Sequence, residues 1–164
     1  MGTTMTVPTM KFDDAFELLI GHEGGYVNNP RDPGGETKYG ISKRSYPGED
    51  IPNMTLARAK AIYLHDYWGA AGCDAVPDVI KADLFDAAVN SGVHAAIRML
   101  QRACSADPDG ILGPRTLMAL QSMAPARLVA RFNGSRLEFM ASLATWPTFS
   151  RGWARRIASN LLQA

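Results

Sequence analysis

The chain has 164 residues, 46% of them hydrophobic, so it has the length of one domain and enough apolar side chains to bury a core. A formal net charge of +1 excludes a protein whose main work is to coat nucleic acid, because that work needs a large basic excess. The two cysteines, Cys73 and Cys104, are too few for a disulfide framework, and we expect both to be buried thiols.

The first ten residues are small, polar and rich in threonine, which predicts a disordered tail over residues 1–10. This tail has no basic residue and no continuous apolar run, so it does not resemble a secretory signal, and no later segment is apolar enough to span a membrane. We therefore expect residues 11–164 to form a single domain that is made in the cytoplasm and does not bind a membrane.

The first helix is predicted to begin near Lys11 and to end near His22 or Glu23. Phe12 and Phe16 recur at helical spacing, and acidic residues occupy the first turn, where they favour the positive end of the helix dipole. Seven Gly and Pro residues then interrupt the pattern between residues 24 and 40, which predicts a long irregular loop or a small hairpin. A long loop in a compact domain is often functional.

Amphipathic patterns return downstream and are separated by glycine-containing breaks. They predict helices over residues 56–68, 79–89, 93–104, 116–123, 125–143 and 149–162. The predicted fold is therefore all-α, mainly helical, with one irregular Gly/Pro-rich insertion after the first helix. There is no heptad repeat that demands assembly, so we expect a monomer.

Glu23 is a candidate general acid. It follows Phe12 by eleven residues and Phe16 by seven, so on a continuous helix it would project from the same apolar face. Burial raises the pKa of a carboxyl group, which keeps it protonated and able to donate a proton near neutral pH. Taken alone, a glutamate at a helix end is more often a solvated surface residue.

The residues after Glu23 supply the other groups that glycosidic hydrolysis needs. Asp32 is a second carboxylate, which can hold a water molecule or stabilise an oxocarbenium ion, and Thr37 adds a hydroxyl group. Tyr26 and Tyr39 offer flat faces on which a sugar ring can stack. Asp32 is equally suited to cap a tight turn at Asp-Pro-Gly-Gly.

The stretch from His22 to Ser42, which begins His-Glu-Gly-Gly-Tyr-Val-Asn-Asn-Pro-Arg-Asp-Pro-Gly-Gly, resembles the motif of glycoside hydrolase family 108. These are lysozyme-like N-acetylmuramidases of phages and bacteria. The resemblance implies that Glu23 is the catalytic acid and that the fold is lysozyme-like. The order Glu, Asp, Thr is also similar to that of phage-type lysozymes, although Thr37 comes one residue earlier here than in their pattern.

Further segments resemble the peptidoglycan-binding region that follows the catalytic part in this family. They run from Phe85 to Gly92, from Asp109 to Thr116 and from Gly152 to Arg156. The resemblance thus implies a catalytic region over about residues 11–95 and a peptidoglycan-binding region over about residues 96–162, packed on it.

Asp86 and Asn90 are candidate substrate-binding residues, because a spacing of four places them on one helix face, from which they could bind acetamido or hydroxyl groups. A polar helix surface, or an asparagine cap before Gly92, explains them equally well. Near Trp153, the arginines 151, 155 and 156 could contact the anionic wall, although a solvated face with Trp153 buried is the simpler explanation.

The sequence indicates no metal site and no cofactor. Asp107-Pro-Asp-Gly begins like a calcium loop, but Ile111 and Met118 stand at later ligand positions. His22, His65 and Asp66 lack the His-Glu-x-x-His spacing of zinc peptidases.

The predicted function is cleavage of the β-1,4 bond between N-acetylmuramic acid and N-acetylglucosamine in bacterial peptidoglycan. A lytic transglycosylase and a non-catalytic peptidoglycan-binding protein are the alternatives. We expect the enzyme to act in the periplasm or on the cell wall, which it would reach through a pore or a secretion machine.

Overall fold

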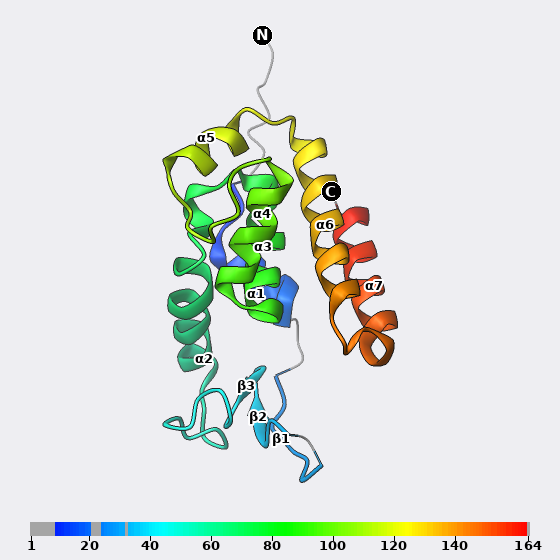
Figure 1. Ribbon diagram of the computed structural model, residues 1–164. Helices are drawn as coiled ribbons and strands as arrows, with labels where there is room; N and C mark the ends of the chain where they lie inside the picture. Colours follow the sequence, from blue (N-terminus) through cyan, green and yellow to red (C-terminus); the bar gives the residue numbers. More distant parts are fainter. Residues whose placement is uncertain (1–8, 21–23, 32, 164) are drawn as a thin grey trace.

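The computed structural model describes residues 9–20, 24–31 and 33–163 (Figure 1). The predicted tail over residues 1–10 therefore lies almost wholly outside the described residues. In chain order the elements are α1 (Phe12–Ile20), β1 (Val27–Asn28), β2 (Glu36–Lys38), β3 (Ile41–Ser42), α2 (Leu56–Tyr63), a π-helical segment (Leu64–Gly69), a 3₁₀ turn (Cys73–Ala75), α3 (Asp78–Ser91), α4 (Val93–Ala103), α5 (Pro114–Gln121), α6 (Pro125–Ser142) and α7 (Trp146–Leu162). This confirms the prediction of a mainly helical fold. None of the described helices is long and apolar enough to cross a membrane.

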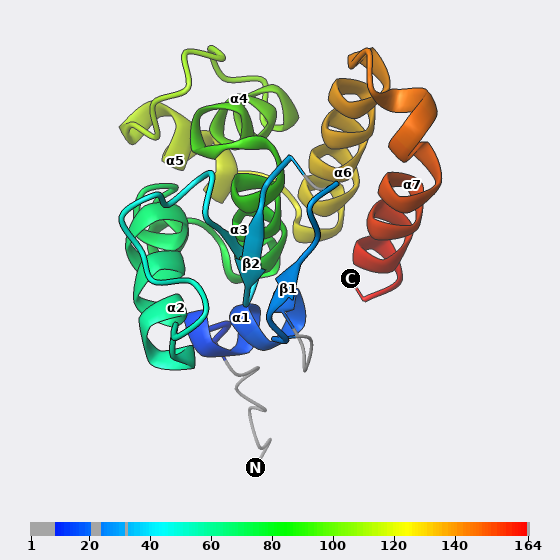
Figure 2. The same ribbon diagram turned by 90° about the horizontal axis from the view of Figure 1, so that it is seen from below.

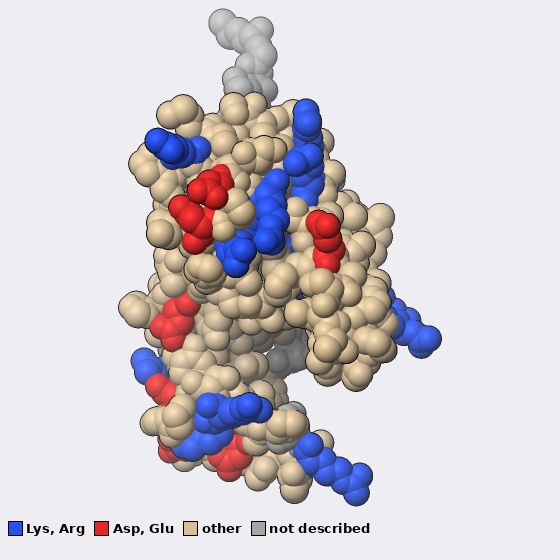
Figure 3. Space-filling view, in the orientation of Figure 1, with Lys and Arg blue, Asp and Glu red and all other residues tan. Residues whose placement is uncertain are grey.

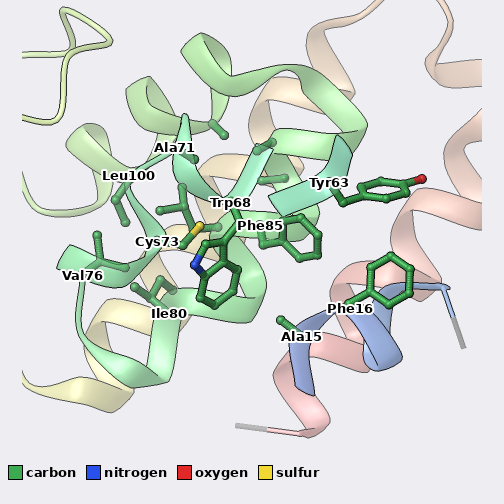
Figure 4. Packing of buried hydrophobic residues seen from close by; sticks show 14 of the residues in the cluster. Ala15, Phe16, Tyr63, Trp68, Ala71, Cys73, Val76, Ile80, Phe85 and Leu100 are labelled. Carbon is green, nitrogen blue, oxygen red and sulfur yellow. The ribbon is translucent and has the colours of Figure 1, made fainter. Parts of the chain in front are cut away.

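Helix α1 is attached to the core by its two phenylalanines. Phe16 is 1% exposed and meets the ring of Tyr63 edge-on (Figure 4). Phe12 meets the rings of Trp68 and Phe85 in the same way. Edge-to-face packing suits aromatic rings because the positive edge of one ring faces the negative face of the other. This packing fixes the direction in which α1 delivers the chain to the sheet.

The irregular stretch after α1 holds a three-stranded antiparallel sheet with the order β1-β2-β3. Val27 pairs with Thr37 across the first ladder, and Thr37 pairs with Ser42 across the second. The predicted hairpin is thus present, together with a third strand. The sheet lies below the helices in Figure 1 and forms a small part of its own.

Helix α2 begins at a side-chain cap, where the Thr55 hydroxyl accepts a hydrogen bond of 3.1 Å from the Arg58 N–H. The sequence pattern predicts one regular helix over residues 56–68. The structure keeps that segment helical but changes its last turn into the π-helical segment, which carries the buried side chain of Trp68. The Trp68 indole donates to Asp74 at 3.0 Å, so the wider turn holds a large ring whose polar atom is satisfied.

Helices α6 and α7 form an antiparallel hairpin beside the helices that carry the core (Figure 2). Helix α6 packs against both α3 and α4. The two long helices start at Pro125 and Trp146, within a few residues of the predicted starts. The hairpin covers the side of α3 that carries Asp86.

The cysteines differ in environment. Cys73 is fully buried, and desolvation raises the pKa of its thiol to about 12, so it stays neutral. Cys104 is only partly buried. The prediction of two buried thiols is therefore right for Cys73 and wrong for Cys104, because Cys104 caps the exposed C-terminal end of α4.

Candidate active site

A hollow separates the part of the molecule that holds the sheet from the helices above it (Figure 3). Helix α1 ends at Ile20 on the upper side of the hollow, and the described chain resumes at Gly24, before β1. A hollow between two parts of one domain is where ligand sites commonly lie.

The two residues predicted to carry the chemistry, Glu23 and Asp32, lie outside the described residues. Their catalytic roles stay predictions, but the structure describes their immediate neighbours in the chain. Gly24 follows Glu23, and a Cβ atom added to Gly24 would lie 2.4 Å from two ring carbons of Tyr39. Only glycine fits beneath that ring, which explains why the motif needs this residue directly after the glutamate.

Tyr39 fixes this junction from the sheet side. Its backbone has a φ of +49°, which is uncommon for a tyrosine, and its carbonyl oxygen accepts a hydrogen bond of 3.0 Å from the Tyr63 hydroxyl. Its ring is occupied by the contact with Gly24, and the Lys38 ammonium lies 5.7 Å from the ring centre. Tyr39 therefore positions the residues beside Glu23, and whether it also touches a sugar stays a prediction.

Tyr26 directly precedes β1, and Thr37 lies on the neighbouring strand β2. The Tyr26 ring is 43% exposed, and its hydroxyl donates to Glu36 at 2.9 Å; partial desolvation and this bond raise the pKa of the Tyr26 hydroxyl. The Thr37 hydroxyl donates to the Gly35 carbonyl at 3.4 Å. The sheet thus brings the predicted residues Tyr26, Thr37 and Tyr39 together, with a tyrosine face open to solvent.

Asp86 lies away from the sheet, on α3, and is buried between two arginines. Its carboxylate accepts from Arg136 of α6 at 2.7 Å and from Arg156 of α7 at 2.5 Å. Asn90 donates to the same carboxylate at 3.0 Å and to the Asp86 carbonyl at 2.7 Å, while the rest of its side chain is exposed. Asp86 and Asn90 are therefore together, as the spacing predicts, and the carboxylate of Asp86 is committed to ion pairs.

A second polar group lies one turn earlier on α3. Asp83 accepts a hydrogen bond of 2.7 Å from the side-chain amide of Asn133. The side-chain oxygen of Asn133 in turn accepts a hydrogen bond of 3.5 Å from Asn160 of α7. Burial raises the pKa of Asp83, and the neighbouring Asp86 raises it further, while Asn133 and Arg136 act in the opposite direction. Asp83, Asp86 and Asn160 line a pocket of about 400 Å³ between α1, α3 and α7.

Arg136 is the residue that the sequence interpretation missed. It is 2% exposed, and its Nη1 atom has no hydrogen-bond partner among the described residues. The spacing of Arg136 could have predicted its burial, because it shares the buried face of α6 with residues at helical intervals: Phe132, Asn133 and Met140. An arginine on such a face requires a buried acid, and Asp86 supplies it.

Comparison with protein families matched two segments of the chain. Residues 16–92 match the model of glycosyl hydrolase 108, and residues 95–158 match that of a predicted peptidoglycan domain. Among solved structures, Brucella abortus SagA is 32% identical with a TM-score of 0.83, and the match covers 93% of this chain and 92% of that chain.

This chain belongs to the glycosyl hydrolase 108 family. Membership confirms the resemblance found in the sequence and makes the protein a glycoside hydrolase, and the second match adds peptidoglycan as its target. The segment that matches glycosyl hydrolase 108 contains the sheet and α3. The segment that matches the predicted peptidoglycan domain contains Arg136 and Arg156, the two arginines that bind Asp86. No curated protein matched the chain.

Proposed function

We propose that this protein is a muramidase that hydrolyses the β-1,4 bond between N-acetylmuramic acid and N-acetylglucosamine. The observation that carries the proposal is the Glu-Gly-Gly-Tyr motif, which stands in the sequence between α1 and β1 of a chain that belongs to a family of glycoside hydrolases. In the described residues on either side of Glu23, Ile20 ends α1 and Gly24 packs against the ring of Tyr39.

In the proposed reaction, Glu23 donates its proton to the glycosidic oxygen while the bond from that oxygen to C1 breaks. The positive charge that develops on the sugar ring is stabilised by Asp32, which also orients a water molecule toward C1. The water oxygen bonds to C1 and its proton passes to a carboxylate. Thr37 and the exposed face of Tyr26 would hold the sugar from the sheet side.

The products distinguish this reaction from that of a lytic transglycosylase. Hydrolysis consumes water and leaves a reducing-end N-acetylmuramic acid, whereas a transglycosylase closes the sugar on itself and leaves a 1,6-anhydro end. Mass spectrometry of fragments released from purified sacculi separates the two by the mass of one water. We expect reducing ends; anhydro ends would replace the muramidase assignment, and binding without any fragments would support a non-catalytic protein.

We also propose that the enzyme acts where peptidoglycan lies, in the periplasm or on the cell wall. Fractionation of producing cells, with detection of the protein beside marker enzymes for each compartment, would test this. Recovery with the cytoplasmic markers alone throughout lysis would contradict it.

A further inference from the structure

Three aromatic side chains form a cluster at the N-terminal end of α7: Trp146, Phe149 and Trp153. The rings of Phe149 and Trp153 stack with centroids 5.6 Å apart and planes 30° apart. The rings of Trp146 and Trp153 are 6.0 Å apart. We call these three residues the aromatic platform.

The platform lies outside the hydrophobic core. Phe149 is 51% exposed and the two tryptophans are partly exposed, and none of the three packs against the main cluster of buried residues. The expectation that Trp153 is buried is therefore wrong, because its ring packs on Trp146 and Phe149 rather than on the main cluster of buried residues. Aromatic surface gathered in the open raises the free energy of a monomer, so it often marks a binding site.

The polar atoms of the platform are also available. The buried Trp68 donates its indole N–H to Asp74, whereas no described residue accepts a hydrogen bond from the indole of Trp146 or of Trp153. Partly exposed indole groups of this kind combine an apolar face with a free donor at the rim.

The helix that carries the platform begins beside the hollow. In Figures 1 and 3, which share one orientation, the turn between α6 and α7 forms the edge of the hollow opposite the sheet. The platform also falls inside residues 95–158, the segment that matches the predicted peptidoglycan domain.

We propose that the aromatic platform is a sugar-binding site that holds one ring of the glycan strand beyond the bond that is cleaved. A pyranose ring presents an apolar face of C–H groups, which packs on an aromatic face, and hydroxyl and acetamido oxygens at its edge, which accept hydrogen bonds from indole N–H groups. The inference rests on the proposed function, because that function supplies the glycan.

A membrane surface is a poorer fit to the same residues. Binding to anionic lipids needs cations beside the aromatic rings. At 3.6 residues per turn, Arg151 and Arg155 fall on the opposite side of α7 from the platform. Arg156 falls on the same side as Phe149, but its guanidinium is paired with Asp86. The platform is aromatic and uncharged, as a site for a neutral sugar ring should be.

The test measures binding without catalysis, in Glu23→Gln protein. Two glycan probes are used: a soluble tetramer of N-acetylglucosamine, followed by tryptophan fluorescence, and purified sacculi, followed by sedimentation. Phosphatidylglycerol vesicles, also followed by sedimentation, test the membrane alternative. Phe149→Ala removes the most exposed ring, and Phe149→Tyr restores it. Leu162→Ala is the control, since Leu162 is 86% exposed on the same helix and lies far from the platform along the chain.

We expect Phe149→Ala to weaken binding of both probes by about threefold to tenfold, the usual worth of one aromatic contact. Phe149→Tyr and Leu162→Ala should bind as the parent does, with unchanged far-ultraviolet circular dichroism in all variants. Equal binding by Phe149→Ala and its parent would overturn the proposal. So would loss of binding to phosphatidylglycerol vesicles with sacculus binding intact, which would assign the platform to membranes.

The outcome is independent of the proposed acid. If Glu23→Gln leaves catalysis intact, the proposed mechanism fails, yet the comparison of Phe149→Ala with Leu162→Ala still reports on the platform. If the platform fails, the assignment of Glu23 stands on its own activity assay.

Discussion

Asp86 is the residue at which three helices meet. It belongs to α3, and its two carboxylate oxygens bind Arg136 of α6 and Arg156 of α7. Arg136 is almost completely buried, so its charge has been removed from water and depends on Asp86 for compensation. The ion pair explains why this acid is on the inner face of α3, where a leucine would otherwise be expected.

Asp86→Ala should therefore lower the free energy of unfolding by about 3–5 kcal/mol, because it leaves the Arg136 guanidinium buried without a partner. Urea titration followed by circular dichroism measures the loss. Arg151→Ala is the matched control: Arg151 is exposed, and its removal should change stability by less than about 0.5 kcal/mol. A stable Asp86→Ala protein with a raised KM would instead make Asp86 a substrate-binding residue.

Asp83 gives the molecule a pH-dependent stability of definite sign. Burial raises its pKa in the folded state, so the folded protein holds the proton at pH values where the unfolded chain has lost it. Stability from this group is present below the unfolded pKa of about 3.9 and is lost as the pH rises through the folded pKa.

Asparagine cannot ionise, so Asp83→Asn removes the loss of stability at higher pH. Its side-chain oxygen can still accept the hydrogen bond from Asn133. We expect the melting temperature of Asp83→Asn relative to wild type to rise as the pH increases from 4 upward. Thermal unfolding at several pH values measures the difference. A difference that stays constant across pH would mean that Asp83 titrates normally in the folded protein.

At the scale of elements, the loop between α4 and α5 is built around Gln101. Its side-chain amide donates to Asp109 at 2.7 Å and to the Ile111 carbonyl at 3.0 Å, and its oxygen accepts from the Gly110 N–H at 2.8 Å. Thr116 lies within 3.2 Å of the same amide. The Asp-Gly-Ile-Leu-Gly-Pro-Arg-Thr segment is therefore a loop held by the hydrogen bonds of a buried glutamine.

Gln101→Leu, which is close in volume, should cost about 1–3 kcal/mol, because it leaves the Gly110 N–H and the Thr116 hydroxyl without their partner. Hydrogen exchange of residues 105–113 should accelerate more than exchange in α6. Unchanged exchange in this loop would show that its own turns hold it. Exposed Gln163→Leu serves as the control.

The helices of the second half could be predicted from sequence because apolar residues recur there at helical spacing and prolines mark the starts of α5, α6 and α7. Strand β3 could not, since two residues are too short to show an alternation. The residues of the sheet come together because they are close in sequence. The arginines of Asp86 are 50 and 70 positions away, and no local pattern connects such distant partners.

At the scale of the whole molecule, one core serves both matched segments. The cluster of buried residues runs from Ala15 through Phe85 and Leu100 to Phe132, and so crosses the boundary predicted near residue 95 between the catalytic and peptidoglycan-binding regions. Helix α3 of the first segment packs on α4 and α6 of the second. The two regions should therefore depend on each other for stability.

We expect a single cooperative unfolding transition, with the same midpoint by far-ultraviolet circular dichroism and by tryptophan fluorescence. Trp68 reports on the first segment and Trp146 and Trp153 on the second, so the two halves are both observed. Two separated transitions would contradict the prediction of one domain and divide the chain near residue 95.

The central claim is that Glu23 is the general acid of a peptidoglycan hydrolase, and one comparison tests it most directly: the rate of turbidity loss of purified peptidoglycan with wild type and with Glu23→Gln. The substitution keeps the shape of the side chain and removes its transferable proton. We expect the rate to fall by roughly a hundredfold to ten-thousandfold, with folding and sacculus binding unchanged. A near-normal rate in Glu23→Gln would contradict the assignment of the acid.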